Sequence, residues 1–184
     1  MADETLKALE ERARAKQAAF IGNIAKRLGR AEPQKERPAH PFKGAPDFWN
    51  AFDLPPEERI SLFMENWRKA GGHAVRTADM DEAKAWIADK VRELSAKRIL
   101  RQRQEELDAM RLEEALPDAE VAVWDDLPPD GRLAAAAGAD IGVFVADRAV
   151  AYTGSLMVMS SAEKGRSVSL LPAAFFAVVP ADRI

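Results

Sequence analysis

Cysteine is absent from the chain, which has 184 residues. Without thiolates the chain can form no disulfide, offers no cysteine nucleophile and cannot ligate an iron–sulfur cluster in the ordinary way. Its two histidines, His40 and His73, lie in different segments, which argues against a zinc site. We therefore expect no metal site in this chain, so any redox group has to be carried by a partner or by a dissociable cofactor.

Long apolar runs and an excess of one charge are absent too. The most apolar stretch, residues 169–181, is too short to span a bilayer and contains Pro172 and Pro180. The chain does not begin with a basic segment followed by an apolar one, so no signal peptide is expected. The net charge is -3, from 27 basic and 30 acidic residues, and gives no general attraction to nucleic acid or anionic membranes. These absences predict a soluble cytoplasmic protein with no membrane span and no nucleic-acid partner.

The standard phosphate-binding and hydrolase motifs are missing as well. GxxxxGK[ST], GxGxxG after a strand, GxSxG and HExxH do not occur. Hydrophobic residues make up 47% of the chain, so a chain of this length can bury a core and fold as a globular body.

Residues 1–30 are expected to form a helical arm. Over residues 5–29, apolar residues recur at helical spacing, and Gly29 lies near the predicted end with Arg27 and Arg30. We expect this arm to pack on the body or on a neighbouring subunit of a homo-oligomer. A nucleic-acid role is the weaker alternative, because acidic residues balance the basic ones.

Residues 31–55 are expected to form a connector. Prolines are too frequent here for a continuous helix. Four aromatic residues interrupt the stretch, namely Phe42, Phe48, Trp49 and Phe52. A solvated tether needs no aromatic residues, so we expect the connector to pack on the body, with a docking strip for a partner as the alternative.

Residues 56–184 show alternating helix and strand patterns. Helices are expected from about Pro56 to Gly71-Gly72, after Asp79 (with Glu82 in the capping-box position), over residues 105–116 and around residues 133–137. Strands are expected over residues 73–76, 97–100, 120–124, 141–145, 150–152, 156–159 and 175–179. Residues 128–131, Pro-Pro-Asp-Gly, predict a turn. This alternation predicts an α/β fold with a mainly parallel sheet and helices on both faces.

The most distinctive stretch starts at Ala139-Asp-Ile-Gly-Val and continues through Ala146-Asp147, Thr153-Gly154-Ser155 and residues 166–172, Arg-Ser-Val-Ser-Leu-Leu-Pro. In order and spacing these motifs resemble the lactate utilisation protein C family, or LUD domain. The upstream Phe63 and Gly71-Gly72 also fit, as does the run from Ile21 to Leu28 that ends in Gly29-Arg30, so the resemblance covers nearly the whole chain.

The resemblance implies the fold of the sugar-phosphate isomerase and CoA-transferase group, a three-layer α/β sandwich that also includes 5-formyltetrahydrofolate cyclo-ligase. It implies a role in oxidation of L-lactate to pyruvate beside two cysteine-rich iron–sulfur partner proteins. The clusters would then lie on the partners only, which is compatible with a chain that has no cysteine.

The chain departs from the family pattern at three places. Tyr152 stands where the family usually has Glu, and Phe175 stands where it usually has His. Both changes remove an ionisable group, which weakens the case for a family acid–base pair in this chain. The chain also stops at Ile184, whereas family members continue into a glycine-rich segment and a closing strand.

Six residues are candidates for a ligand site. Thr153, Gly154 and Ser155 offer hydroxyls and backbone N–H groups to a carboxylate or phosphate. Lys164 and Arg166 could supply positive charge, and Asp147 could orient Arg166 or a substrate hydroxyl. The alternative is structural, because Thr-Gly-Ser between two strands is a good hairpin turn with Gly154 in an unusual conformation.

Three functions stay open at this stage. The first is a component of an L-lactate oxidation system that acts with iron–sulfur partners and binds a small carboxylate. The second is a stand-alone enzyme of the formyltetrahydrofolate cyclo-ligase or CoA-transferase type, by fold analogy alone. The third is an interaction protein with a degenerate site, which Tyr152 and Phe175 favour.

Overall fold

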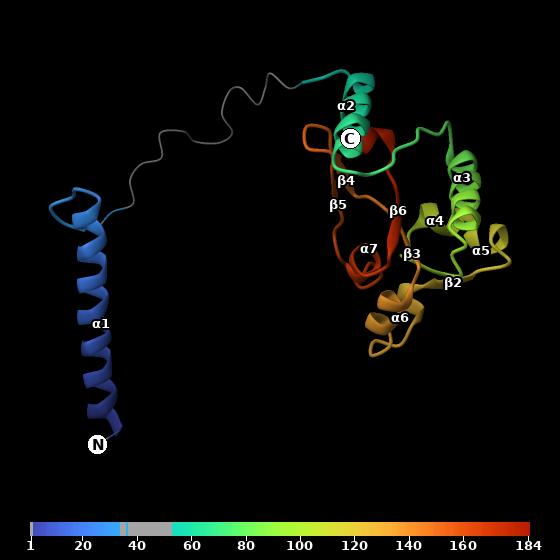
Figure 1. Cartoon of the computed structure of the whole chain (residues 1–184). Coiled ribbons are helices and arrows are strands. Elements are labelled where there is room, and N and C mark those ends of the chain that lie inside the picture. Colours follow the sequence, from blue (N-terminus) through green and yellow to red (C-terminus); the bar gives the residue numbers. More distant parts are fainter. Residues whose placement is uncertain (1, 34–35, 37–52) are drawn as a thin grey trace. The chain divides into compact units, whose positions relative to one another are not determined.

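The computed structural model describes residues 2–33, 36 and 53–184. The chain divides into two units, residues 1–52 and 53–184 (Figure 1). The expected packing of the aromatic connector falls on residues outside the described ones, and the three-part domain division stays a prediction. Among the described residues, no helix is long and apolar enough to cross a membrane.

In the first unit, the described residues include the helix α1 (Ala2–Arg27), close to the helix expected over residues 5–29. The chain leaves it through a left-handed glycine, Gly29 with φ +69°. There the Gly29 N–H donates to the Lys26 carbonyl and the Arg30 N–H to the Ala25 carbonyl. This pair of hydrogen bonds is the Schellman arrangement, which satisfies carbonyls left free at the helix end.

A four-stranded parallel sheet forms the centre of the second unit. Its strands are β1 (Arg98–Arg101), β2 (Glu120–Val123), β3 (Ile141–Val145) and β6 (Ala174–Val178), in the spatial order β2-β1-β3-β6. The mainly parallel sheet expected from the sequence is therefore confirmed. A separate antiparallel hairpin joins β4 (Arg148–Val150) to β5 (Ser155–Met157).

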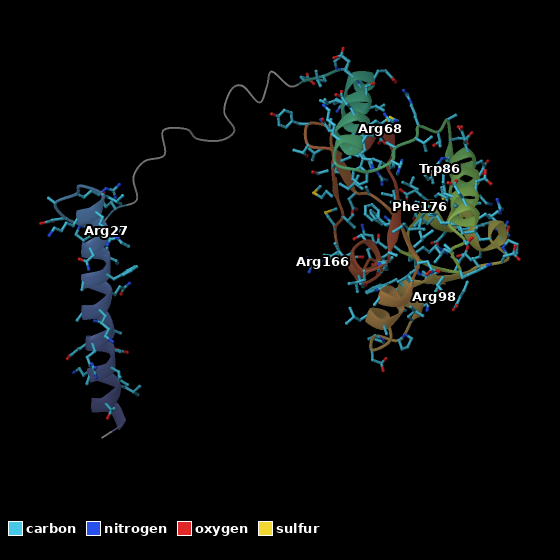
Figure 2. All side chains as sticks on the ribbon, in the orientation of Figure 1. Arg27, Arg68, Trp86, Arg98, Arg166 and Phe176 are labelled. Atoms are coloured by element: carbon cyan, nitrogen blue, oxygen red, sulfur yellow. The ribbon has the colours of Figure 1, made fainter. Side chains whose placement is uncertain are left out.

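Three helices cover one face of the sheet, namely α3 (Met80–Glu93), α4 (Glu105–Met110) and α5 (Leu112–Ala115). Alternate residues of the central strands, such as Ile141, Val143 and Val145, join a buried cluster with these helices. Phe176 of β6 meets Trp86 of α3 edge-on, with ring centroids 5.6 Å apart (Figure 2). This layer is the larger part of the core.

The other face carries α2 (Pro56–Lys69), α6 (Arg132–Gly138) and α7 (Ser167–Leu170), with short 3-10 turns at Trp124–Asp126 and Ala181–Arg183. Gly142 of β3 lies against α7 so closely that a Cβ there would be 1.9 Å from the Val168 carbonyl oxygen. Phe144 and Phe175 turn toward α2, where Phe175 contacts Trp67. Two helical layers on one sheet make the three-layer sandwich that the family resemblance implied.

Two local predictions are wrong, and the strand expected over residues 150–152 lies earlier, at Arg148–Val150, because residues 151–154 form the hairpin turn. Residues 73–76 form no strand, because α2 side chains bind their carbonyls: Trp67 donates to His73 and Arg68 to Ala74. The helix expected over residues 105–116 breaks at Arg111, which has φ +50°. A continuous helix would turn Leu112 about 140° away from Leu107, whereas the break lets both enter the same core cluster.

Candidate functional site

Chain order reverses between β1 and β3. The chain places β2 on one side of β1 and then crosses to place β3 on the other side. In open parallel α/β sheets, ligands bind outside the carboxyl ends of the strands at such a reversal. Gln102, Arg103 and Gln104 follow β1 at this edge, and Ala146 and Asp147 follow β3.

Gln102 is fully buried at this reversal. Its backbone N–H donates to the Val143 carbonyl at 3.0 Å, and its side-chain Nε2 donates to the Gly165 carbonyl at 3.2 Å. Its Oε1 accepts no hydrogen bond from the residues that the structure describes. Gln104 differs, because both of its amide atoms bind the backbone of Val145, at 2.8 and 2.9 Å, and clamp the two strand ends together.

Asp147 organises the segment that crosses this edge. Its Oδ1 accepts from Lys164 Nζ at 2.7 Å, and its Oδ2 accepts from the Met159 N–H at 2.7 Å. The side chains of Asp147 and Lys164 are only 15% and 18% exposed. Burial alone would raise the pKa of Asp147, but the hydrogen bonds from Lys164 and Met159, with the charges of Lys164 and Arg183, outweigh it and lower that pKa. Asp147 is therefore ionised at neutral pH and holds residues 159–164 against the end of β3.

Two arginines form three further ion pairs at the same edge. Arg183 donates to the Ala146 carbonyl at 3.3 Å and to Glu106 at 2.8 Å. Arg103 donates to Asp125 at 2.8 Å and also to Asp126. These contacts neutralise most of the charged side chains here.

Gly165 passes between the ends of β1 and β2. A Cβ at this position would be 2.2 Å from the Trp124 ring, so the backbone is packed directly on the indole. Trp124 Nε1 in turn donates to Ser167 Oγ at 2.9 Å. The neighbour Arg166 is exposed at the start of α7 and makes no ion pair within the described part of the chain (Figure 2).

The six residues predicted for the site fall into two groups. Asp147 and Lys164 meet at the carboxyl edge, whereas Arg166, two residues after Lys164, is exposed and is not the partner of Asp147. Residues 153–155 lie at the tip of the hairpin, beside α2, where Asn66 Nδ2 donates to the carbonyls of Ala151 and Tyr152 at 3.0 Å each. Because β4 and β5 have three residues each, the tip is about 10 Å from the end that holds Asp147.

The hairpin-turn interpretation of Thr153-Gly154-Ser155 is confirmed. The Gly154 N–H donates to the Val150 carbonyl at 2.9 Å, and Gly154 has φ +62°. A Cβ there would also be 2.6 Å from the Trp67 backbone nitrogen. Both the conformation and the space require glycine, and a ligand role for these three residues stays a prediction.

Among the residues of this edge that the sequence analysis did not single out are Gln102, Arg103, Gln104, Glu106 and Arg183. The polar stretch Gln102-Arg-Gln directly after the buried strand β1 was a signal for the first three. The departures from the family pattern lie elsewhere: Tyr152 is exposed on the hairpin tip, and Phe175 packs between Phe144 and Trp67.

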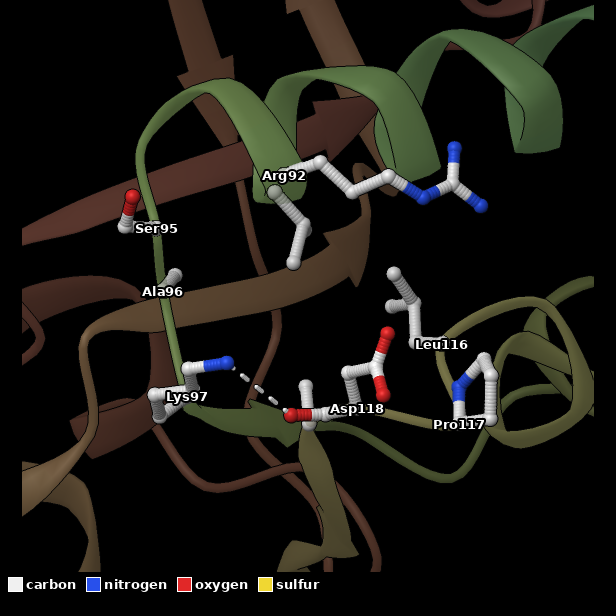
Figure 3. A pocket seen from close by; sticks show the side chains of 9 residues that line it. Arg92, Ser95, Ala96, Lys97, Leu116, Pro117 and Asp118 are labelled. Atoms are coloured by element: carbon white, nitrogen blue, oxygen red, sulfur yellow. Dashed lines mark hydrogen bonds between the residues drawn. The ribbon is translucent and has the colours of Figure 1, made fainter.

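Two surface hollows among the described residues lie away from this edge. One, of about 210 Å³, lies at the opposite, amino end of the strands, between Ser95, Lys97, Leu116 and Asp118 (Figure 3). The other, of about 400 Å³, follows α2 past Leu62. No group of three or more His, Asp or Glu residues in the described ranges could hold a metal ion.

A parallel sheet between two helical layers, with polar residues at its chain reversal, defines an open three-layer α/β protein. Within that class, the chain belongs to the LUD domain family, whose model matches residues 60–184.

Its curated relatives include Lactate utilization protein C of Halalkalibacterium halodurans, 29% identical over 163 residues, or 88% of this chain and 70% of that protein. Lactate utilization protein C of Shouchella clausii is 25% identical over 162 residues, again 88% of this chain and 70% of that protein. The same-named protein of Bacillus licheniformis is 41% identical over 61 residues, 33% of this chain and 25% of that protein. No solved structure matched the chain.

Proposed function

We propose that this protein is a component of L-lactate utilisation, acting with iron–sulfur partner proteins in the oxidation of L-lactate to pyruvate. Relatives aligned over 88% of the chain are named lactate utilization protein C. Because the chain has no cysteine, the electron-carrying clusters have to lie on the partners.

We further propose that the carboxyl edge of the sheet binds a small carboxylate. The observation that carries this is the Lys164-Gly165-Arg166 segment. One cationic side chain precedes and one follows a glycine whose carbonyl accepts a hydrogen bond from Gln102. Arg166 has no ion-pair partner among the described residues, so its guanidinium is available to a carboxylate in two-pronged geometry. Lys164 forms an ion pair with Asp147, and this pair fixes the position of the Lys164 ammonium group at the edge.

A growth experiment tests the cellular role. A strain without this gene is grown on L-lactate as sole carbon source and complemented with the wild-type chain, with Lys164→Met/Arg166→Gln, or with Lys97→Met at the opposite edge. Wild type and Lys97→Met should restore growth, and the double variant should not, at equal protein abundance by immunoblot. Normal growth of the deletion strain, with no other lactate oxidase present, would overturn the proposal.

Direct binding and partner capture test the two remaining parts. Calorimetric titration with L-lactate and with pyruvate should give heat with the wild type and at least ~10-fold weaker binding with the double variant, since one bidentate contact is lost. A tagged chain from lactate-grown cells should retain proteins with an iron–sulfur chromophore. If no binding heat is measured, the proposed carboxylate site is rejected. If no iron–sulfur chromophore is retained, the proposed iron–sulfur partners are rejected. Neither result changes the interpretation of the growth experiment.

A further inference from the structure

One face of α1, continued into the turn that follows it, consists mostly of apolar residues. Its residues follow each other at spacings of three and four, which places them on one side of a helix. They are Leu6, Leu9, Ala13, Gln17, Phe20, Ile24 and Leu28. The large ones are exposed, for example Leu6 at 61%, Phe20 at 66% and Leu28 at 62%.

We expect this apolar face to pack against another structural element. A helix in water owes most of its stability to packing of an apolar face, because helix propensity alone leaves it marginal. Contiguous exposed apolar surface on a folded protein marks an interaction site. α1 has 26 residues, a length of about 39 Å, so the covering element has to be long as well.

Large and small side chains along this face fit each other when two copies of the helix lie antiparallel. With Gln17 near the centre, Leu6 of one helix lies beside Leu28 of the other, and Leu9 lies beside Ile24. The large Phe20 then lies beside the small Ala13, and by symmetry this fit occurs twice. In a parallel pair, Phe20 would meet Phe20 and Ala13 would meet Ala13.

The charge pattern selects the same orientation. Residues 1–11 of the sequence contain four acidic residues and one lysine, whereas residues 12–30 contain six basic residues and no acidic one. An antiparallel pair sets the acidic end of each helix against the basic end of the other. A parallel pair would bring Arg27 on this face against its own copy, while the antiparallel pair separates the two Arg27 residues by about 30 Å.

From these two patterns we propose that α1 pairs with α1 of a second copy in antiparallel orientation and makes the protein a homodimer. The occupant of the apolar face is thus a second copy of this chain. The proposed pairing rests on α1 alone and does not depend on the proposed function.

Solution mass tests the pairing. Light scattering on the full chain should give twice the 20.3 kDa of one chain. Phe20→Glu should raise the dimer dissociation constant by about 100-fold or more, because each interface loses two aromatic anchors and gains two buried charges. Ala18→Glu adds the same charge about 160° around the helix and should leave the dimer intact. A wild-type monomer, or equal effects of the two variants, would overturn the proposal.

The absence of cysteine allows a direct test of orientation. Leu6→Cys and Leu28→Cys are purified separately, mixed in equal amounts and oxidised, while each variant is also oxidised alone. The antiparallel pair predicts a disulfide-linked dimer containing one chain of each variant and little product from either variant alone. Crosslinking of each variant with itself indicates a parallel pair, and no crosslinking indicates that α1 packs elsewhere; both results reject the proposal.

Discussion

Asp147→Asn isolates the contact that holds the edge segment in place. The carboxylate accepts one hydrogen bond from Lys164 Nζ and one from the Met159 N–H, both at 2.7 Å. Asparagine has nearly the same shape and keeps one oxygen acceptor. It loses the negative charge and leaves the largely buried Lys164 ammonium without its counter-ion.

The expected loss of unfolding free energy follows from these contacts. A hydrogen bond between charged groups contributes about 1.5–3 kcal/mol, and the pair is mostly shielded from solvent, so we expect Asp147→Asn to cost about 2 kcal/mol at pH 7. With a urea dependence of about 2 kcal/mol per molar for a chain of this size, the urea midpoint should fall by about 1 M.

The effect should depend on pH with a defined sign. The pKa of Asp147 in the folded protein is lower than in the unfolded chain, where an aspartate has a pKa of about 3.9. The stability that Asp147 contributes is complete above the unfolded pKa and is lost as pH falls through the folded pKa. Asparagine does not titrate, so the difference between wild type and variant should be constant from pH 7 to about pH 5 and shrink below about pH 4.

Urea unfolding followed by tryptophan fluorescence at pH 7, 5.5 and 3.5 measures this difference. Asp130→Asn, on the exposed turn at residues 128–131, removes the same charge and should change stability by less than about 0.5 kcal/mol. Equal midpoints for wild type and Asp147→Asn at pH 7 would refute the structural role of the pair. A difference that grows below pH 4 would refute the assigned pKa direction.

Two further predictions concern the packing around the sheet. Gly142→Ala should lower the free energy of unfolding by about 3 kcal/mol in the same urea assay, because its Cβ would lie 1.9 Å from the Val168 carbonyl oxygen. Gly138→Ala is the matched control, since its Cβ approaches only Arg98 Nη1 at 3.5 Å and should not destabilise; similar losses for both variants would contradict the packing argument. Arg101→Met should cost about 2 kcal/mol, less than a fully buried pair, because it leaves the half-exposed Asp108 and Glu113 unpaired. An unchanged melting temperature of Arg101→Met would show that this ion-pair group does not stabilise the fold.

Features set by neighbouring residues could be predicted from the sequence. The start of α3 is an example, since Asp79 accepts from the Glu82 N–H at 2.8 Å as its capping position implied. The turn at residues 128–131 also forms, with the Gly131 N–H donating to the Pro128 carbonyl. The alternation of helix and strand patterns identified the parallel sheet, because parallel strands require long crossovers.

Features that depend on distant partners could not be predicted in this way. The break at Arg111 allows Leu112 to reach the core, and the helical spacing of apolar residues in the sequence does not predict that break. Residues 73–76 have strand propensity but lie beside α2 without a neighbouring strand. Arg101 is 6% exposed in a central strand, and its two acidic partners on α4 and α5, together with the Gln102 carbonyl, make that burial tolerable.

The candidate site likewise has some features that the sequence determines and others that only the tertiary structure decides. The sequence by itself determined the family, the residue types of the distinctive motifs and the need for glycine at the hairpin turn, because these depend on residue order and local conformation. Only the tertiary structure decided that Lys164 meets Asp147, that Gln102 holds Gly165 across 63 residues of chain, and that residues 153–155 lie at the other end of the hairpin. The physical reason is that strand order and register arise from packing between distant segments, which periodicity along the chain does not encode.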